Sequence, residues 1–281
     1  MSTLDLAQAT TNGVHQRHDA HAPPLTTPLL QAINLSQRFG NVLACDRIHL
    51  DLYPGEVLGI VGESGSGKSS LLHCLAGHVL PSEGQILFAS KDQGVQDVVT
   101  MNEARRRFLQ RTDWGFVHQS ARDGLRSDVS AGANVGERLM AVGARHYGAI
   151  RQEAQHWLAR VEIDETRIDD LPRYFSGGMQ QRLQIARNLV TKPRLIFMDE
   201  PTASLDVSVQ ARLLDLLRQL VSQLHVAAVI VTHDLAVARL LAHRLMVMRQ
   251  GQVVEQGLTD QVLDDPQHPY TQLLVSSVLQ A

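Results

Sequence analysis

The segment that most constrains the fold is a glycine-rich run that follows a short apolar strand. Residues 62–69 read Gly-Glu-Ser-Gly-Ser-Gly-Lys-Ser and fit the pattern G-x-x-x-x-G-K-[ST]. Glycines let the backbone wrap closely around phosphate oxygens, with successive N–H groups turned inward. A helix that follows such a loop adds its positive N-terminal end. The run therefore predicts a phosphate-binding loop between a strand at Val57–Val61 and a helix at Ser70–Ala76.

This loop assigns individual residues to a nucleoside triphosphate. Lys68 is expected to reach the β- and γ-phosphates, and the Ser69 hydroxyl is expected to ligate Mg²⁺. The residues expected to contact the nucleotide in this segment are Gly62, Ser64, Gly65, Gly67, Lys68, Ser69 and Ser70. GTPases and small-molecule kinases share such a loop, so the motif alone leaves the class of nucleotide-binding protein open.

The wider hydrophobic pattern predicts an α/β fold. Strands are expected around Leu30–Arg38 and Ile48–Leu52, and two more unbroken apolar strands are expected at Leu195–Met198 and Ala228–Val231. Helices with an apolar face are expected over Ile150–Val161, after Gly178, and in the segment that ends at Leu224. Strands without polar alternation that alternate with helices imply a mostly parallel sheet covered on both faces. The helical middle section is expected to form a separate lobe.

Composition and charge exclude several classes of protein. The formal net charge of -3 argues against a protein that coats nucleic acid. No apolar run approaches the roughly 20 residues that span a bilayer, and the N-terminus lacks the pattern of a signal peptide. Cys45 and Cys74 have neither zinc-ligand spacing nor the density of a disulfide framework. We therefore expect a cytoplasmic protein without nucleic-acid partners, in which both cysteines are plain thiols.

Two adjacent acids follow the predicted strand at Leu195–Met198. Successive strand residues point in opposite directions, so Asp199 and Glu200 need not share a role. Asp199 is expected to hold the Mg²⁺ shell, while Glu200 orients and deprotonates the attacking water. A kinase would need an acceptor hydroxyl site, and the sequence offers no candidate for one. The pair therefore favours hydrolysis.

A capped helix start is predicted where the helix after the middle lobe begins. Residues 176–182 read Ser-Gly-Gly-Met-Gln-Gln-Arg, which places a capping serine and two glycines at a helix N-terminus. Ahead of the Asp199–Glu200 strand, this run resembles the signature motif of the ABC (ATP-binding cassette) family. Phe175 and Met179 stand where the commonest signature has Leu and Gln, while the serine and both glycines are kept. The resemblance extends over nearly the whole chain from Leu29.

The resemblance implies an ABC ATPase core with an N-terminal antiparallel β-subdomain, and it also implies roles for shorter motifs. Gln119 looks like the Q-loop glutamine, which would take part in catalysis and ligate Mg²⁺. His233 looks like the switch histidine, which would join Glu200 in catalysis by contacting the γ-phosphate. Phe39 occupies the place of the aromatic residue that stacks on adenine. ATP and Mg²⁺ are therefore the implied ligands.

The family also implies that two copies of the chain act together. There, the signature of one subunit meets ATP held by the other, which would here involve Ser176, Gly177 and Gly178. Two chains would sandwich two ATP molecules, and hydrolysis would release the sandwich. Asp206, in the counterpart of the D-loop, would contact the nucleotide site and communicate between the two sites.

The chain divides into three expected parts. Residues 1–28 are polar, carry His15, His18 and His21, and are expected to be a disordered extension rather than a metal tract. Residues 29–257 are expected to form the ATPase domain, with its helical lobe at about 120–188. Residues 258–281 form the expected C-terminal tail.

Three kinds of ABC system differ in the partner they imply. The run Asp265–Leu274 resembles oligopeptide and nickel importers, whose ATPases need membrane-spanning permeases. The segment Asp123–Gly148 instead resembles the ATP-binding subunit of the carbon–phosphorus lyase system that breaks down phosphonates. A DNA-repair or chromosome ATPase would separate its two halves with coiled coils or zinc inserts, which this sequence lacks. The resemblance favours the core subunits of a soluble lyase complex, with Arg126, Arg138 and Arg145 as the expected docking contacts.

Overall fold

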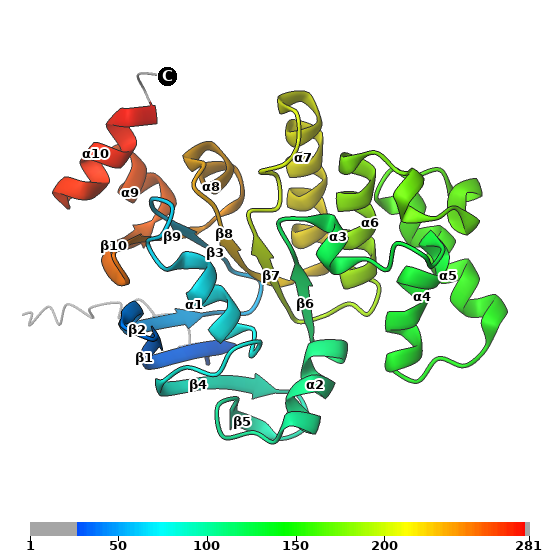
Figure 1. The fold of residues 1–281 in the computed structure, drawn as a ribbon, viewed down its shortest axis with the longest axis horizontal. Helices are drawn as coiled ribbons and strands as arrows, with labels where there is room; N and C mark the ends of the chain where they lie inside the picture. Colours follow the sequence, from blue (N-terminus) through cyan, green and yellow to red (C-terminus); the bar gives the residue numbers. More distant parts are fainter. Residues whose placement is uncertain (1–26, 279–281) are drawn as a thin grey trace, which may run out of the picture.

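The computed structural model describes residues 27–278, which form two β-sheets with helices packed against them (Figure 1). His15, His18, His21 and most of the predicted extension lie outside the described residues, as do the last residues of the predicted tail. The division of the chain at residues 28 and 257 stays a prediction. The smaller sheet is antiparallel, with the order β2-β1-β4-β5. Its strands are β1 (Leu30–Phe39), β2 (Val42–Leu52), β4 (Glu83–Ser90) and β5 (Gly94–Asp97).

The larger sheet is parallel except for one edge strand, and its order is β10-β9-β3-β8-β7-β6. Its strands are β3 (Val57–Val61), β6 (Trp114–Val117), β7 (Leu195–Asp199), β8 (Ala227–Val231), β9 (Arg244–Arg249) and β10 (Gln252–Leu258). Every residue of β3 and β8 is buried, as expected for apolar strands that are covered on both faces. The predicted α/β fold with a mostly parallel sheet is confirmed.

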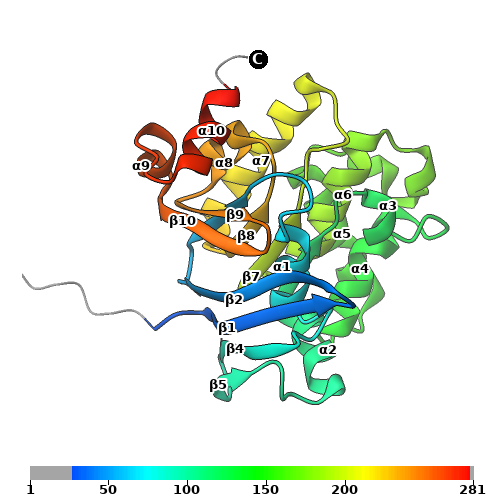
Figure 2. The same ribbon diagram turned by 60° about the vertical axis from the view of Figure 1, so that its left-hand side comes forward.

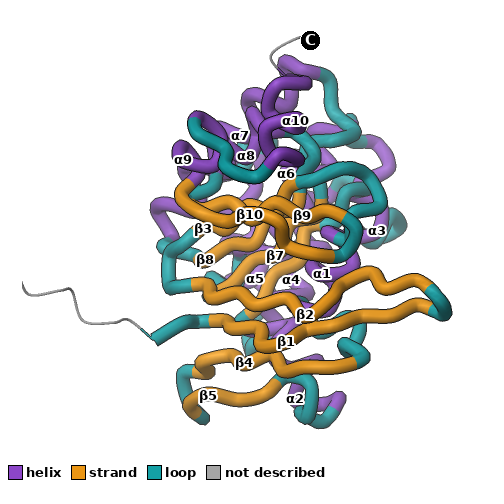
Figure 3. Tube along the Cα trace, turned by 90° about the vertical axis from the view of Figure 1, so that its left-hand side faces the viewer, coloured by secondary structure: helices purple, strands orange, loops and turns teal. Residues whose placement is uncertain are grey.

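The two sheets lie as separate layers, with helix α1 (Lys68–Leu75) packed between them (Figures 2 and 3). One hydrophobic cluster joins Leu35 of β1, Leu71 of α1 and Phe197 of β7, all essentially fully buried. Because both sheets pack against α1, the loop between β3 and α1 is held at the carboxyl end of β3. In an open parallel sheet, ligands bind at this end of the strands.

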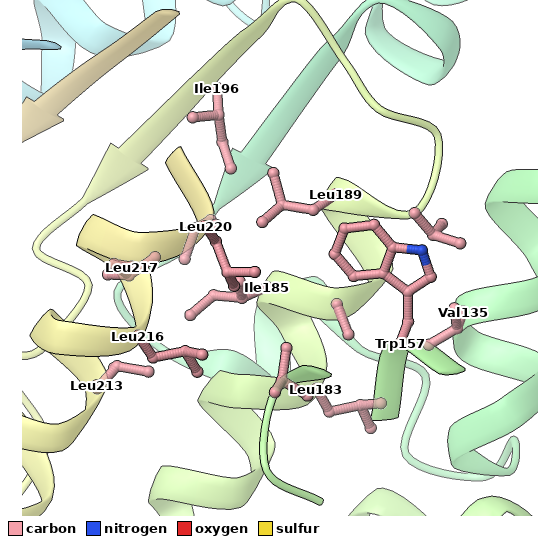
Figure 4. Packing of buried hydrophobic residues seen from close by; sticks show 14 of the residues in the cluster. Val135, Trp157, Leu183, Ile185, Leu189, Ile196, Leu213, Leu216, Leu217 and Leu220 are labelled. Atoms are coloured by element: carbon pink, nitrogen blue, oxygen red, sulfur yellow. The ribbon is translucent and has the colours of Figure 1, made fainter. Parts of the chain in front are cut away.

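A lobe of helices follows β6 (Figure 1). It contains α3 (Ala121–Gly124), α4 (Ala131–Ala141), α5 (Tyr147–Arg160), α6 (Gly177–Leu189) and two short 3-10 helices, Glu165–Asp169 and Pro172–Tyr174. Trp157 lies in its centre, in one cluster with Leu183 and Leu189 of α6 (Figure 4). The same cluster continues through Ile196 of β7, so the lobe shares its core with the larger sheet.

The remaining helices pack against other parts of the larger sheet. They are α2 (Glu103–Thr112), α7 (Val207–Leu224), α8 (Leu235–Leu241), α9 (Thr259–Asp264) and α10 (Pro269–Val278). A separate hydrophobic cluster joins α8 and the last two helices to β3 and β9. Within residues 27–278, every helix is too short or too polar to cross a membrane.

Two predicted elements begin earlier than the hydrophobic pattern indicates. Strand β2 starts at Val42 rather than Ile48, because it pairs with β1 through a tight turn that sets Phe39 opposite Val42. Helix α5 starts at Tyr147 rather than Ile150, because the His146 side chain caps it by accepting a hydrogen bond from the Ala149 N–H at 3.1 Å. In both cases the first residues are exposed or half-buried.

Both cysteines are buried and free, as expected for plain thiols. Burial raises the pKa of the Cys45 thiol to about 12, and it raises the pKa of the Cys74 thiol to the same value. Both thiols are therefore protonated at physiological pH, which makes them poor nucleophiles and poor metal ligands.

One expected docking contact is wrong. The guanidinium of Arg138 donates hydrogen bonds to the backbone carbonyl oxygens of Gln110 at 2.9 Å and Trp114 at 2.6 Å. Burial lowers the pKa of this guanidinium to about 10. Arg138 therefore ties α4 to the last turn of α2 and to the start of β6, and it is not free to contact a partner. Arg126 and Arg145 are exposed.

Replacing Arg138 with Met is expected to lower the free energy of unfolding by about 1–3 kcal/mol, because two carbonyl oxygens lose their donors. Urea unfolding followed by circular dichroism measures this change. The matched variant Arg145→Met also removes hydrogen bonds to two carbonyl oxygens, but at an exposed site where water replaces them, so it should change the value by less than about 0.5 kcal/mol. Equal effects of the two variants would contradict the structural role of Arg138.

Candidate functional site

The phosphate-binding loop has the backbone conformation that its glycines predict. Gly67, the residue before α1, has φ 103°. A β-carbon there would lie 2.0 Å from the carbonyl oxygen of Ala44, and one on Gly62 would lie 2.2 Å from that of Met248. Contacts this short do not occur between real atoms, so only glycine fits at either position. The loop is thus packed tightly against neighbouring backbone.

Lys68 is buried at the start of α1, with 5% of its surface exposed. Its ammonium donates hydrogen bonds to the carbonyl oxygens of Gly62 at 2.9 Å and Glu63 at 2.7 Å. Burial lowers the pKa of Lys68, and the negative charges of Glu200, Asp199 and Glu63 oppose that change. The loop therefore holds a poorly hydrated cation that an anion in the cleft would stabilise further.

Asp199 ends β7 and Glu200 follows it, and the two acids contact different partners, as expected for acids that need not share a role. The Ser69 hydroxyl donates to Asp199 Oδ1 at 2.9 Å. Glu200 Oε2 instead lies 2.8 Å from His233 Nδ1. Glu200 has φ 41°, in the left-handed region, and its N–H donates to the carbonyl oxygen of Val231 at 2.9 Å. This uncommon backbone conformation turns Glu200 away from the line of the strand.

A cleft of about 870 Å³ brings most of the predicted nucleotide residues together. From the sequence-predicted set it is lined by Phe39, Ser64, Gly65, Gly67, Lys68, Ser69, Ser70, Gln119, Glu200 and His233. Phe39 ends β1 and is 49% exposed, which leaves its ring free to stack on a ligand. Gly62 and Asp199 touch this set through Lys68 and Ser69.

The cleft also contains residues that sequence reasoning missed. They are Val42, Leu43 and Ala44 at the start of β2 and Gln250 and Gly251 in the turn between β9 and β10. The Gly251 N–H donates to the carbonyl oxygen of Ser66 at 2.9 Å, so this turn supports the phosphate loop. The Gln-Gly pair carries a turn signal, but nothing local in the sequence places that turn beside residue 66.

Helix α6 positions the segment that leads to Gln119. Gln181 and Gln184 are buried on this helix. The His118 N–H donates to Gln184 Oε1 at 2.6 Å, and both glutamine amides donate to the His118 carbonyl oxygen at 3.2 Å. These three hydrogen bonds fix the backbone of His118 and so place Gln119, the next residue, between the lobe and the cleft. The sequence offered a signal here, because Gln181 and Gln184 fall among the apolar residues of the buried face of this helix.

The predicted signature residues do not line this cleft. Ser176 caps α6 by accepting a hydrogen bond from the Met179 N–H at 3.3 Å, and Ser176 and Gly177 are exposed. Gly177 lines a neighbouring groove of about 390 Å³, which it shares with Gln119. Gly178 is buried against Val209, and Asp206 is exposed at the N-cap of α7. Within the described chain, the N-terminal end of α6 therefore lies exposed outside the phosphate-loop cleft.

Comparison with known proteins matches these features. Residues 45–203 match the ABC transporter family, and residues 254–281 match the C-terminal region of oligopeptide/dipeptide transporters. The chain is 64% identical over 256 residues to the phosphonates utilization ATP-binding protein PhnK of Escherichia coli (strain K12), covering 91% of this chain and 100% of that protein. It is 36% identical to the dipeptide transport ATP-binding protein DppD of the same organism, covering 89% of this chain and 78% of that protein.

Solved structures of ATP-binding cassettes have the same fold as this chain. The dimeric, ADP- and phosphate-bound ATP-binding cassette MJ0796 superposes with a TM-score of 0.73 at 29% identity, covering 82% of this chain and 98% of that one. The cassette cbiO1 of Clostridium perfringens superposes with a TM-score of 0.72 at 29% identity, covering 85% of this chain and 92% of that one. By its sequence, its fold and the arrangement of its phosphate loop, the chain belongs to the ABC transporter family and carries the ATP-binding cassette of an ATPase.

Proposed function

We propose that this ATPase hydrolyses Mg-ATP as a sandwich dimer in the cytoplasm and couples hydrolysis to a carbon–phosphorus lyase complex in phosphonate breakdown. The observation that carries the ATP site is the gathering of the phosphate loop, Gln119, Glu200 and His233 around one cleft. The observation that supports the lyase system is 64% identity over the full length of a phosphonates utilization ATP-binding protein.

In this proposal the loop binds the triphosphate and Lys68 supplies its main counterion. The Lys68 ammonium is held by two backbone carbonyls and has little access to water, so binding an anion costs little further desolvation. Phe39 stacks on the base from the open side of the cleft. Backbone N–H groups at the start of α1 face the phosphates.

The residues beside Lys68 fit a magnesium ion. The Ser69 hydroxyl and the Asp199 carboxylate meet at 2.9 Å, and hard oxygen donors of this kind are the ligands that Mg²⁺ takes in combination with substrate phosphates. Gln119 lines the same cleft and would complete the protein contribution. When bound, Mg²⁺ neutralises the charge that develops on the phosphates.

Glu200 acts as the general base in this account, and His233 positions it. The Glu200 carboxylate is largely shielded, with 18% of its side chain exposed, whereas His233 is 61% exposed. Their contact at 2.8 Å fixes one carboxylate oxygen and leaves the other to accept the proton of an attacking water. The exposed imidazole is free to reach the γ-phosphate.

The exposure of the N-terminal end of α6, outside the phosphate-loop cleft, supports the dimer. Ser176 and Gly177 present a helix N-terminus that does not reach the phosphate loop of the same chain. In a sandwich, the second copy's signature would supply this anion site to the nucleotide. Asp206 is exposed near the same surface and would lie between the two sites. The dimeric form of the structural relative MJ0796 supports the same arrangement.

An importer subunit is the second candidate. The match of residues 254–281 to oligopeptide/dipeptide transporters and the 36% identity to a dipeptide transport protein favour it. The phosphonate-related protein is much more similar and is covered completely, so we rank the lyase complex first.

Affinity purification from native cells distinguishes the two candidates. The chain, tagged at its C-terminus, should co-purify with soluble carbon–phosphorus lyase subunits, and its deletion should abolish growth on a phosphonate as sole phosphorus source. Recovery of integral membrane permeases instead, with normal growth on the phosphonate, would support the importer.

The double variant Arg126→Ala, Arg145→Ala tests docking through the segment Asp123–Gly148. It should reduce recovery of the lyase subunits while the ATPase rate stays the same.

A further inference from the structure

The C-terminal helix reaches back to the phosphate loop. The backbone N–H of Glu63, the second residue of the loop, donates a hydrogen bond to the hydroxyl oxygen of Tyr270 at 3.0 Å. Tyr270 belongs to α10 and is 4% exposed. The two residues are 207 positions apart in the chain. A buried tyrosine hydroxyl needs a polar partner, and here that partner is part of the loop.

Neighbouring residues hold Tyr270 in this position from several sides. The Tyr270 N–H donates to His268 Nδ1 at 3.1 Å. The Glu255 carboxylate of β10 accepts hydrogen bonds from the N–H groups of Gln267 at 2.8 Å and His268 at 3.0 Å, which fixes the approach to α10. The Arg249 guanidinium lies 4.9 Å from the centre of the Tyr270 ring. The hydroxyl is therefore presented to the loop by a rigid support.

Tyr270 contacts the peptide that joins Gly62 to Glu63, and the Gly62 carbonyl oxygen of that peptide accepts a hydrogen bond from the Lys68 ammonium at 2.9 Å. The carbonyl oxygen of Glu63 accepts a hydrogen bond from the Lys68 ammonium at 2.7 Å, and it accepts a second from the Ser66 N–H at 3.2 Å. Glu63 is thus held by Tyr270 on its amide side and holds Lys68 on its carbonyl side. Glu63 itself is exposed, so few other contacts restrain its backbone.

We propose that Tyr270 is a positioning residue for the phosphate loop, whose hydroxyl fixes the peptide between Gly62 and Glu63 and so sets the place of the Lys68 ammonium. The inference rests on the proposed ATP site and adds that the C-terminal helix belongs to that site. A phenylalanine would fill the same apolar pocket beside Val61 and Leu263. The hydroxyl contributes order in the loop rather than packing.

The test compares Tyr270→Phe with Tyr53→Phe, which makes the same chemical change at a half-buried tyrosine in the turn before β3. In Tyr270→Phe, the loop amides at residues 63–66 should exchange with deuterium about three- to tenfold faster without nucleotide, the factor expected for one lost hydrogen bond. The Kd of ATP with Mg²⁺, measured by isothermal titration calorimetry, should rise by a similar factor. The KM for ATP should rise in parallel while kcat stays within about twofold, because the lost contact acts equally on the ground and transition states. Tyr53→Phe should match the wild type throughout.

The outcomes separate this proposal from the ATP site on which it rests. Faster loop exchange with unchanged Kd and KM would overturn the positioning role, and so would unchanged exchange with unchanged affinity. A melting temperature that falls together with kcat would show that Tyr270 is merely structural and would also overturn it. If the wild type itself binds no ATP in calorimetry, the proposed ATP site fails, whatever Tyr270 does.

Discussion

Replacing Glu200 with Gln is expected to lower kcat for ATP hydrolysis by about 10²- to 10⁴-fold, the range that a positioned general base supplies. The amide keeps the shape of the side chain and its contact distance to His233 but cannot accept the proton of the attacking water. Release of inorganic phosphate measures the rate. Mg-ATP binding should remain within a few-fold of wild type, because Lys68, Ser69 and Asp199 are untouched.

The matched control is Glu83→Gln, an exposed carboxylate at the start of β4 that should leave kcat unchanged. A Glu200→Gln variant that hydrolyses ATP within tenfold of the wild-type rate would contradict the general-base role. In that case the water would have to be activated by another group.

Replacing Lys68 with Ala is expected to abolish productive ATP binding, with affinity lowered about 100-fold. The phosphates lose a charge-assisted hydrogen bond from a cation that the loop has already desolvated. Calorimetry with ATP and Mg²⁺ measures the loss. Lys91→Ala, at an exposed lysine in the turn between β4 and β5, removes the same charge far from the loop and should bind normally. Near wild-type affinity in Lys68→Ala would disprove the assignment of residues 62–69 as the phosphate-binding loop.

The phosphate loop and the sheet that carries it were predictable because their signals are contiguous. Strand, glycine loop and helix start follow one another in residues 57–75, and each property depends on neighbours within a few positions. The same holds for β7 with its two acids, which the structure shows contacting different partners.

The parts that could not be predicted depend on contacts between distant segments. Gln184 braces His118 across 66 residues, and Tyr270 reaches Glu63 across 207. No local pattern shows which of many polar side chains will meet a given backbone group after folding. Arg138 illustrates the opposite error, since its charge suggests a surface contact and its carbonyl partners are visible only in the fold.

The central claim is that two chains close around ATP, with each chain's signature completing the other's site. The direct measurement is the molar mass of the Glu200→Gln variant with Mg-ATP, by size-exclusion chromatography with light scattering. We expect a species of twice the 31.0 kDa chain mass. We also expect that adding Ser176→Arg, which places a bulky charge at the N-terminal end of α6, prevents that species. A monomer with ATP, or an ATP-bound dimer that forms equally well with Ser176→Arg, would contradict it.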